Sequence, residues 1–135
     1  MQTEAYVRKA EELFSAGYNC AQAVAGAFAD VTDLSPDAVL RASCAFGGGF
    51  ARTHNNLCGA VSGMGIIAGL VYGSDDPKSK LNLYPRVQAM TAKFQDTFGS
   101  VVCAQLLQNR TKTCKDCVRK AAEILAEDLH ANEHI

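Results

Sequence analysis

The sequence has no tryptophan, and its β-branched residues are scattered rather than alternating with polar ones. Alternation with a period of two marks a half-buried strand, so nothing in the chain predicts a pair of strands. The formal net charge is −1, which argues against nucleic acid and anionic membrane surfaces as partners. The longest apolar stretch, residues 57–72, has 16 residues and contains four glycines. A membrane span needs about 20 residues, and we expect none.

A secretory signal is also lacking at the beginning of the sequence. Charged residues interrupt the first 12 positions and leave no continuous apolar segment there. We therefore expect a cytoplasmic location. With 135 residues, of which 48% are hydrophobic, the chain is long enough to build a core of its own. We expect a single domain over residues 1–135.

Periodicity and capping signals predict an all-α fold. Ser35, Pro36 and Asp37 follow one another as they do at a helix start. Thr113 can cap a final amphipathic helix, whose acidic residues, Asp128 among them, are expected in solvent. We predict a compact bundle of five to seven helices, one or two of them short. The expected helices cover residues 3–15, 20–31, 36–46, 57–73, 83–98, 100–108 and 114–131.

Cysteine, by contrast, is abundant: the chain has six. In a reducing compartment disulfide staples are disfavoured, and metal or redox use gains weight. Cys20, Cys58, Cys103 and Cys114 each fall within the first turn or so of a predicted helix. A helix N-terminus offers unpaired N–H groups and about half a positive charge, which lower the pKa of a thiol. We expect reactive or metal-binding thiols, with small buried hydrophobic residues as the alternative.

Glycines follow Cys58 at the spacing of one helical turn. Gly59 and Gly63 leave room around the sulfur for another sulfur, a metal or a substrate, so we expect them to border a bound cofactor or substrate. Gly65 and Gly69 continue the spacing and are expected in tight helix packing. Each glycine costs about 1 kcal/mol of helix stability relative to alanine, which packing or a site must offset.

Three other features leave alternatives open. Cys114 and Cys117 form C-x-x-C on one helix face, without the βαβ context of a redox motif or the second pair of a zinc ribbon. Cys44, inside a predicted helix, is expected in the core. The glycine-rich loop of residues 47–56 either caps the preceding helix or covers the Cys58 site. His54 in this loop is expected at the surface, with a role as proton donor or ligand as the alternative.

Four segments resemble the C_GCAxxG_C_C family of bacterial and archaeal proteins: GYNCAQAV, FGGGFARTHNNLCGAVSGMGIIAGLVYG, FGSVVCAQLL and CKDCVRKAAEIL. The resemblance extends from about residue 6 to about residue 126. It implies a small helical protein with redox activity, whose motif cysteines are Cys20, Cys58, Cys103 and Cys114. Cys117 stands where the family usually has an aromatic residue, so the functional last cysteine is either Cys114 or Cys117.

Three functional hypotheses follow. In the first, a thiol-based oxidoreductase or electron carrier uses Cys58 as the attacking thiolate and Cys20 or Cys103 to resolve the intermediate, with a redox partner that the sequence does not specify. In the second, Cys20, Cys58, Cys103 and Cys114 bind an iron–sulfur cluster or zinc. In the third, the chain is a non-catalytic helical interaction module whose glycine-rich helix forms a homodimer interface.

Overall fold

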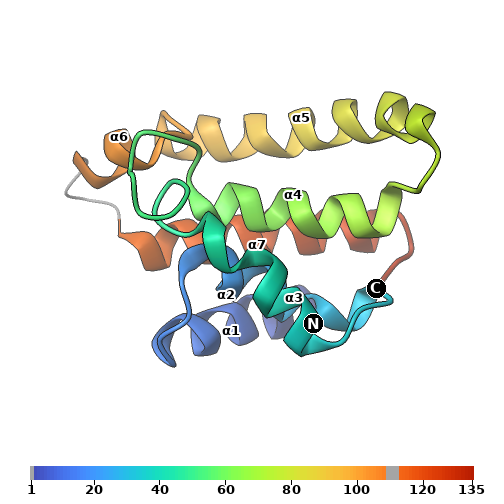
Figure 1. The fold of residues 1–135 in the computed structure, drawn as a ribbon, viewed down its shortest axis with the longest axis horizontal. Helices are drawn as coiled ribbons and strands as arrows, with labels where there is room; N and C mark the ends of the chain where they lie inside the picture. Colours follow the sequence, from blue (N-terminus) through green and yellow to red (C-terminus); the bar gives the residue numbers. More distant parts are fainter. Residues whose placement is uncertain (1, 109–112) are drawn as a thin grey trace.

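The protein is described by a computed structural model of residues 2–108 and 113–135. Within these ranges it has seven α-helices and no strand, which confirms the all-α prediction. The helices are α1 (Gln2–Ser15), α2 (Cys20–Ala27), α3 (Pro36–Ser43), α4 (Gly59–Tyr72), α5 (Lys80–Phe98), α6 (Cys103–Gln108) and α7 (Cys114–Ala131) (Figure 1).

Short 3₁₀ turns account for the differences between predicted and observed boundaries. α2 ends at Ala27, and a turn over Ala29–Val31 replaces the end of the predicted helix. α3 likewise ends at Ser43 and is followed by a turn over Cys44–Phe46. Asp76 caps a third turn, Pro77–Ser79, which leads directly into α5. α5 therefore begins at Lys80 rather than near residue 83.

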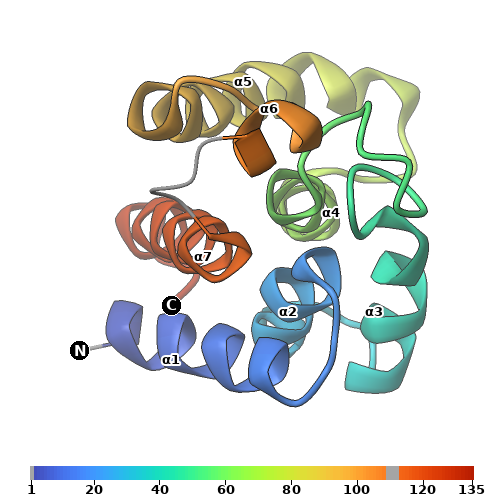
Figure 2. The same cartoon turned by 90° about the vertical axis from the view of Figure 1, so that its left-hand side faces the viewer.

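Three of the helices run in the same direction. α2, α4 and α7 all begin at the end of the bundle where α6 lies, at the left of Figure 1, and α1 and α5 run the opposite way. α7 packs against α1, α2, α4 and α5, and α4 packs against α2 and α5 (Figure 2). The largest fully buried side chains include Phe28, Met64, Ile67, Phe94 and Leu125. The shared direction brings three helix N-termini to one end.

Side-chain caps fix where α2 and α7 begin. The Asn19 side chain accepts a hydrogen bond from the Gln22 N–H, and the Gln22 side-chain oxygen accepts one from the Asn19 N–H. Thr113 and Asp116 form the same reciprocal pair at α7. Each such cap stabilises the helix start by about 1 kcal/mol. The caps thereby set the positions of the cysteines that follow them.

Glycine at position 63 allows the backbones of α2 and α4 to approach closely. A Cβ built at Gly63 would lie 2.6 Å from the Ala21 carbonyl oxygen, so this close contact requires glycine. Built at Gly65 or Gly69, it would meet nothing within 4 Å. The prediction of tight packing at Gly65 and Gly69 is therefore wrong, because both lie on a face of α4 that no neighbouring helix covers that closely. That this face meets a second copy of the chain stays a prediction.

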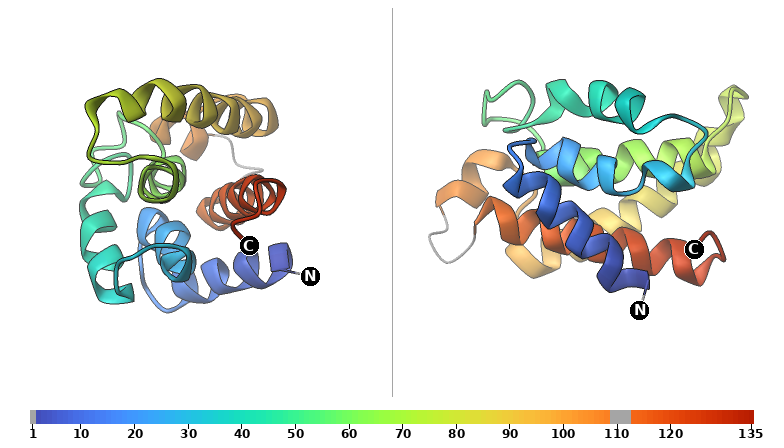
Figure 3. Two further views of the ribbon diagram at one scale, coloured as in Figure 1. Left: turned by 90° about the vertical axis from the view of Figure 1, so that its right-hand side faces the viewer. Right: turned by 90° about the horizontal axis from the view of Figure 1, so that it is seen from below.

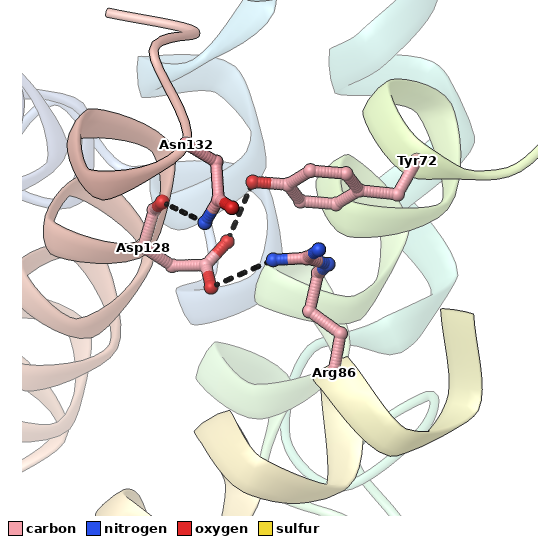
Figure 4. A network of polar contacts seen from close by, with 4 residues as sticks. All are labelled: Tyr72, Arg86, Asp128 and Asn132. Carbon is pink, nitrogen blue, oxygen red and sulfur yellow. Dashed lines mark hydrogen bonds and ion pairs between the residues drawn. The ribbon is translucent and has the colours of Figure 1, made fainter. Parts of the chain in front are cut away.

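A polar network joins α4, α5 and α7 at the end of the bundle opposite α6 (Figure 4). The Tyr72 hydroxyl donates a 2.7 Å hydrogen bond to Asp128, and Arg86 lies 3.4 Å from the same carboxylate. The Arg86 guanidinium also lies over the Tyr72 ring, 4.0 Å from its centroid. The Asp128 side chain is only 16% exposed, so the prediction that it is solvated is wrong. Pairing with two partners from other helices compensates for its burial.

The two ends of the chain lie close to the same side of the bundle, next to the antiparallel α1 and α7 (Figure 3). None of the helices within residues 2–108 and 113–135 is both long and apolar enough to cross a membrane.

Candidate functional site: a cavity lined by cysteines

A cavity of about 560 Å³ opens at the end of the bundle where α2, α4 and α7 begin. All six cysteines of the sequence line it, although they come from five separate parts of the chain. None of them is in a disulfide. The cysteines are Cys20, Cys44, Cys58, Cys103, Cys114 and Cys117. The fold therefore gathers the thiols of this chain at one place.

The four motif cysteines stand at helix starts, as their sequence positions predict. Cys20 is the first residue of α2, Cys103 of α6 and Cys114 of α7. Cys58 is the N-cap residue of α4. Cys20, Cys58 and Cys103 are buried, whereas Cys114 is exposed at the mouth. Their chemical roles stay predictions.

Backbone hydrogen bonds join the two segments that contain Cys58 and Cys103. The Cys58 N–H donates to the Val101 carbonyl at 2.7 Å, and the Cys103 N–H donates to the Asn56 carbonyl at 3.0 Å. Leu57 and Val102 form an isolated antiparallel bridge between these bonds. Two segments more than 40 residues apart are thus paired over three residues. So short a pairing has no periodic signal in the sequence.

Two further cysteines complete the cavity. Cys117 lies one helical turn after Cys114, is only 4% exposed, and interacts through its thiol with Cys58. Its i, i+3 spacing from Cys114, which places both cysteines on one face of α7, was the sequence signal that could have placed it in the cavity. The prediction that Cys44 lies in the core is wrong: Cys44 is exposed on the cavity wall, because α3 ends at Ser43 and the following turn redirects the chain.

A left-handed loop forms one wall of the cavity. Five consecutive residues, Gly48 to Arg52, have positive φ angles, and so does His54. Three of the five have side chains, and each costs about 1–2 kcal/mol in this conformation. Backbone hydrogen bonds back to Ala45, Gly47 and Gly48, 2.7–3.0 Å long, hold the loop. Strain of this kind persists where surrounding contacts enforce it and clusters at functional sites.

The loop brings His54 to Cys103. His54 Nδ1 lies 3.4 Å from Cys103 Sγ, within hydrogen-bond distance for sulfur. The Ala104 N–H donates to the His54 carbonyl at 2.7 Å, which anchors the histidine beside α6. A Cβ at Gly49 would lie 2.6 Å from the Cys103 Cβ, so glycine is needed for this approach. The prediction that His54 is a surface residue is wrong, since it is half-buried and borders the cavity.

Burial and neighbouring thiols raise the pKa values of the cavity cysteines. Interaction with the Cys117 thiol, followed by burial, raises the pKa of Cys58 far above its usual range. Burial, and then the Cys58, Cys20 and Cys114 thiols, raise the pKa of Cys103 to about 11. The pKa values of Cys20 and Cys114 are raised too, chiefly by burial. The prediction that helix N-termini lower the thiol pKa values is therefore wrong. The N–H groups of Ala60 and Val61 do lower the pKa of Cys58, but by less than Cys117 and burial raise it.

These raised pKa values predict how stability depends on pH. The unfolded chain releases thiol protons near pH 8.5, whereas folded Cys103 holds its proton to about pH 11. The stabilisation is therefore complete below about pH 8.5 and is lost as the pH rises through the folded value. We expect the free energy of unfolding of the reduced protein to fall between pH 8 and pH 10. Urea denaturation under reductant measures it, and a level or rising profile would contradict the raised values.

The matched control for this profile is Cys58→Ala, because the pKa of Cys58 is raised by both Cys117 and burial. The variant should show a shallower fall over the same pH range, whatever its stability at pH 7.

Gly59 and Gly63, the two glycines predicted to border a cofactor, have different neighbours. A Cβ at Gly59 would collide with Cys20 Sγ, so the absence of a side chain there leaves space for a cavity sulfur. Gly63 instead contacts the backbone of α2 at Ala21 and is not part of the cavity lining. Gly63 therefore serves helix packing.

The described side chains form no ready-made metal site. Across residues 2–108 and 113–135, no three His, Cys, Asp or Glu side chains are grouped so that they could hold one metal ion. That Cys20, Cys58, Cys103 and Cys114 bind an iron–sulfur cluster or zinc stays a prediction.

The fold and the cavity define a small all-helical protein whose cysteines line one cavity, at the end of the bundle where several helices begin. The chain matches the family model described as "Putative redox-active protein (C_GCAxxG_C_C)" over residues 18–128. It belongs to this family, as its motifs indicate, and the family description supports a redox role in general terms. Comparison with curated proteins gives no match, and neither does comparison with solved structures.

Proposed function

We propose that the protein performs thiol–disulfide redox chemistry in the cysteine-lined cavity. One observation supports this above all: every cysteine of the chain lines the same cavity, and both Cys58 and Cys117 are buried there. The Cys117 thiol is also the largest influence on the pKa of Cys58, so we infer that small adjustments bring these two sulfurs together as a disulfide.

Cys103 is the better candidate for the first attack on a disulfide substrate. His54 Nδ1 lies 3.4 Å from its sulfur and can take up the thiol proton. Cys58 has no such partner, and its pKa is raised further. The sequence-based hypothesis gives the first attack to Cys58. We instead give Cys58 the second attack, since Cys58 is the thiol that influences Cys103 most among its neighbours.

The steps balance as an exchange of two electrons. The Cys103 thiolate attacks one sulfur of a substrate disulfide and releases the other half as a thiol, leaving a mixed disulfide. Cys58 attacks the Cys103 sulfur and releases the second half. Cys117 then attacks Cys58, which frees Cys103 and leaves the Cys58–Cys117 disulfide. The substrate disulfide is reduced to two thiols, which take up the two protons that the protein thiols lose.

Mapping the disulfide tests this proposal. The fully reduced protein is titrated with 2-hydroxyethyl disulfide, quenched with acid, alkylated and digested, and the linked peptides are identified by mass spectrometry. We expect one intramolecular disulfide that joins Cys58 and Cys117. Cys44→Ser is the control, because Cys44 is exposed at the wall and has no part in the scheme. If no intramolecular disulfide forms between any cavity cysteines, the proposal is wrong.

Replacing His54 should slow the reaction of Cys103. Asparagine is the replacement of choice, because it tolerates the positive φ of 66° at this position. Without the imidazole, alkylation of Cys103 by iodoacetamide at pH 7.5 should fall by roughly tenfold, corresponding to about one pKa unit. Cys114 in the same molecule serves as the internal reference. Equal slowing of both thiols would indicate a change in the cavity as a whole and would contradict the role of His54.

A further inference from the structure

The cavity has a marked charge asymmetry. Among the described residues that line it, Arg52 is the only arginine or lysine, and no aspartate or glutamate lines it. Tyr18, Asn19 and Thr113, which also line it, carry no formal charge at pH 7. From the described residues, the cavity therefore offers one guanidinium and no carboxylate to a bound molecule.

The backbone holds Arg52 in place at the cavity. Its φ angle is 60°, and its N–H donates to the Gly47 carbonyl at 3.0 Å. A Cβ at Gly48 would lie 3.2 Å from the Arg52 Cβ and 3.3 Å from its Cγ, so the stem of the side chain packs over Gly48. The Gly48 N–H in turn interacts with the Cys20 sulfur. Arg52 is thus separated from a cavity sulfur by a single residue.

The guanidinium has no acidic partner in the part of the chain that the structure describes. The ion pairs there use Arg86, Arg119, Lys115 and Lys120, and Arg52 is in none of them. A charge that strained backbone holds at a cavity, without a partner, is available to a ligand.

We propose that the substrate of this cavity is a small organic disulfide that carries a carboxylate, and that Arg52 binds the carboxylate. The proposal rests on the proposed thiol–disulfide function and adds the substrate class. A volume of about 560 Å³ suits a small molecule, since ligand cavities typically measure about 300–1,000 Å³. Guanidinium and carboxylate pair through two parallel hydrogen bonds, which fixes the orientation of the ligand as well as its charge.

The reaction has the same balance as above. A cavity thiolate attacks one sulfur of the anionic disulfide, and the S–S bond breaks. One carboxylate-bearing thiol leaves after each of two attacks. Two protein thiols are oxidised to a disulfide, and the substrate is reduced to two thiols.

The test compares three disulfides of similar size and different charge: anionic 3,3′-dithiodipropionate, neutral 2-hydroxyethyl disulfide and cationic cystamine. The rate constant for oxidation of the reduced protein by each is divided by the rate constant for dithiothreitol with the same reagent. This division removes differences in intrinsic reactivity. The variants are Arg52→Gln, Arg52→Glu and Arg52→Lys, and the control is Arg41→Gln, an exposed arginine of α3 outside the cavity.

We expect the wild-type protein and R41Q to prefer the anionic over the neutral disulfide. R52Q should reduce that ratio by about tenfold, as expected for loss of one charge-assisted contact. R52E should favour cystamine, R52K should keep part of the anion preference, and the preference should weaken with added salt.

Three results would overturn the proposal. If R52Q slows all three disulfides in parallel, so that the ratio is unchanged, Arg52 has only a structural role. If the wild-type protein shows no anion preference, the substrate class is wrong while the thiol–disulfide function stands. If even the neutral disulfide fails to produce an intramolecular disulfide, the proposed function fails, and this inference fails with it.

Discussion

Cys117→Ser and Cys58→Ser will each abolish the Cys58–Cys117 disulfide and lower the equilibrium constant for forming an intramolecular disulfide more than a hundredfold. The reason is proximity: positioned groups react with effective concentrations that reach about 10⁵ M or more. Cys117 is buried at 4% exposure, and its thiol is the largest cause of the raised pKa of Cys58. Removal of either thiol leaves the other without this partner. Equilibration with a thiol–disulfide buffer, followed by mass spectrometry, gives this constant from the yield.

The two serine variants should differ in what accumulates. In C117S the scheme stops at a Cys58–Cys103 disulfide, because backbone hydrogen bonds to Val101 and Asn56 hold together the segments that contain these two cysteines. In C58S it stops at a mixed disulfide between Cys103 and the small thiol. Cys44→Ser provides the matched control with an unchanged yield. A C117S protein that forms the same disulfide yield as the wild type would show that Cys117 is only a packing residue.

Replacing Gly63 with alanine should destabilise the fold, whereas the same change at Gly65 should stabilise it. Both residues lie inside α4, so both gain about 1 kcal/mol of helix propensity. At Gly63 the added Cβ would lie 2.6 Å from the Ala21 carbonyl oxygen, a backbone atom that cannot move aside without shifting α2. Overpacking of this kind typically costs about 1–3 kcal/mol or more. We expect the variants to differ by about 3 kcal/mol, or roughly 10 °C in Tm.

The comparison is controlled within one helix. Gly69, like Gly65, has no atom within 4 Å of an added Cβ, so Gly69→Ala should behave as Gly65→Ala does. Thermal unfolding by circular dichroism under reductant measures all three. Equal Tm values for the Gly63 and Gly65 variants would contradict the close approach of α2 and α4.

The helices could be predicted from sequence because their signals are local. Asn19, Ser35 and Thr113 each accept a hydrogen bond from a backbone N–H within three residues, so a short stretch of sequence contains both partners. The convergence of the helix starts depended on the shared direction of α2, α4 and α7. That direction results from tertiary packing, but the repeated placement of cysteine at helix starts was a usable signal for it.

The cavity wall could not be predicted in the same way. Phe50, Ala51 and Arg52 have positive φ angles that their side chains disfavour, and no local signal marks them. The conformation is enforced by hydrogen bonds to Ala45 and Gly47. For the same reason, the approach of His54 to Cys103, 49 residues away, had no sequence pattern. The thiol pKa values were also misjudged, because burial outweighs the helix N-terminus and burial depends on the whole fold.

The most direct test of the account is a count of thiols and metal in the anaerobically purified protein, before and after oxidation by one equivalent of 2-hydroxyethyl disulfide. The account predicts six titratable thiols in the denatured reduced protein and four after oxidation, with no stoichiometric metal and no visible absorbance. A coloured protein with stoichiometric iron, or six thiols that remain after oxidation, would contradict it.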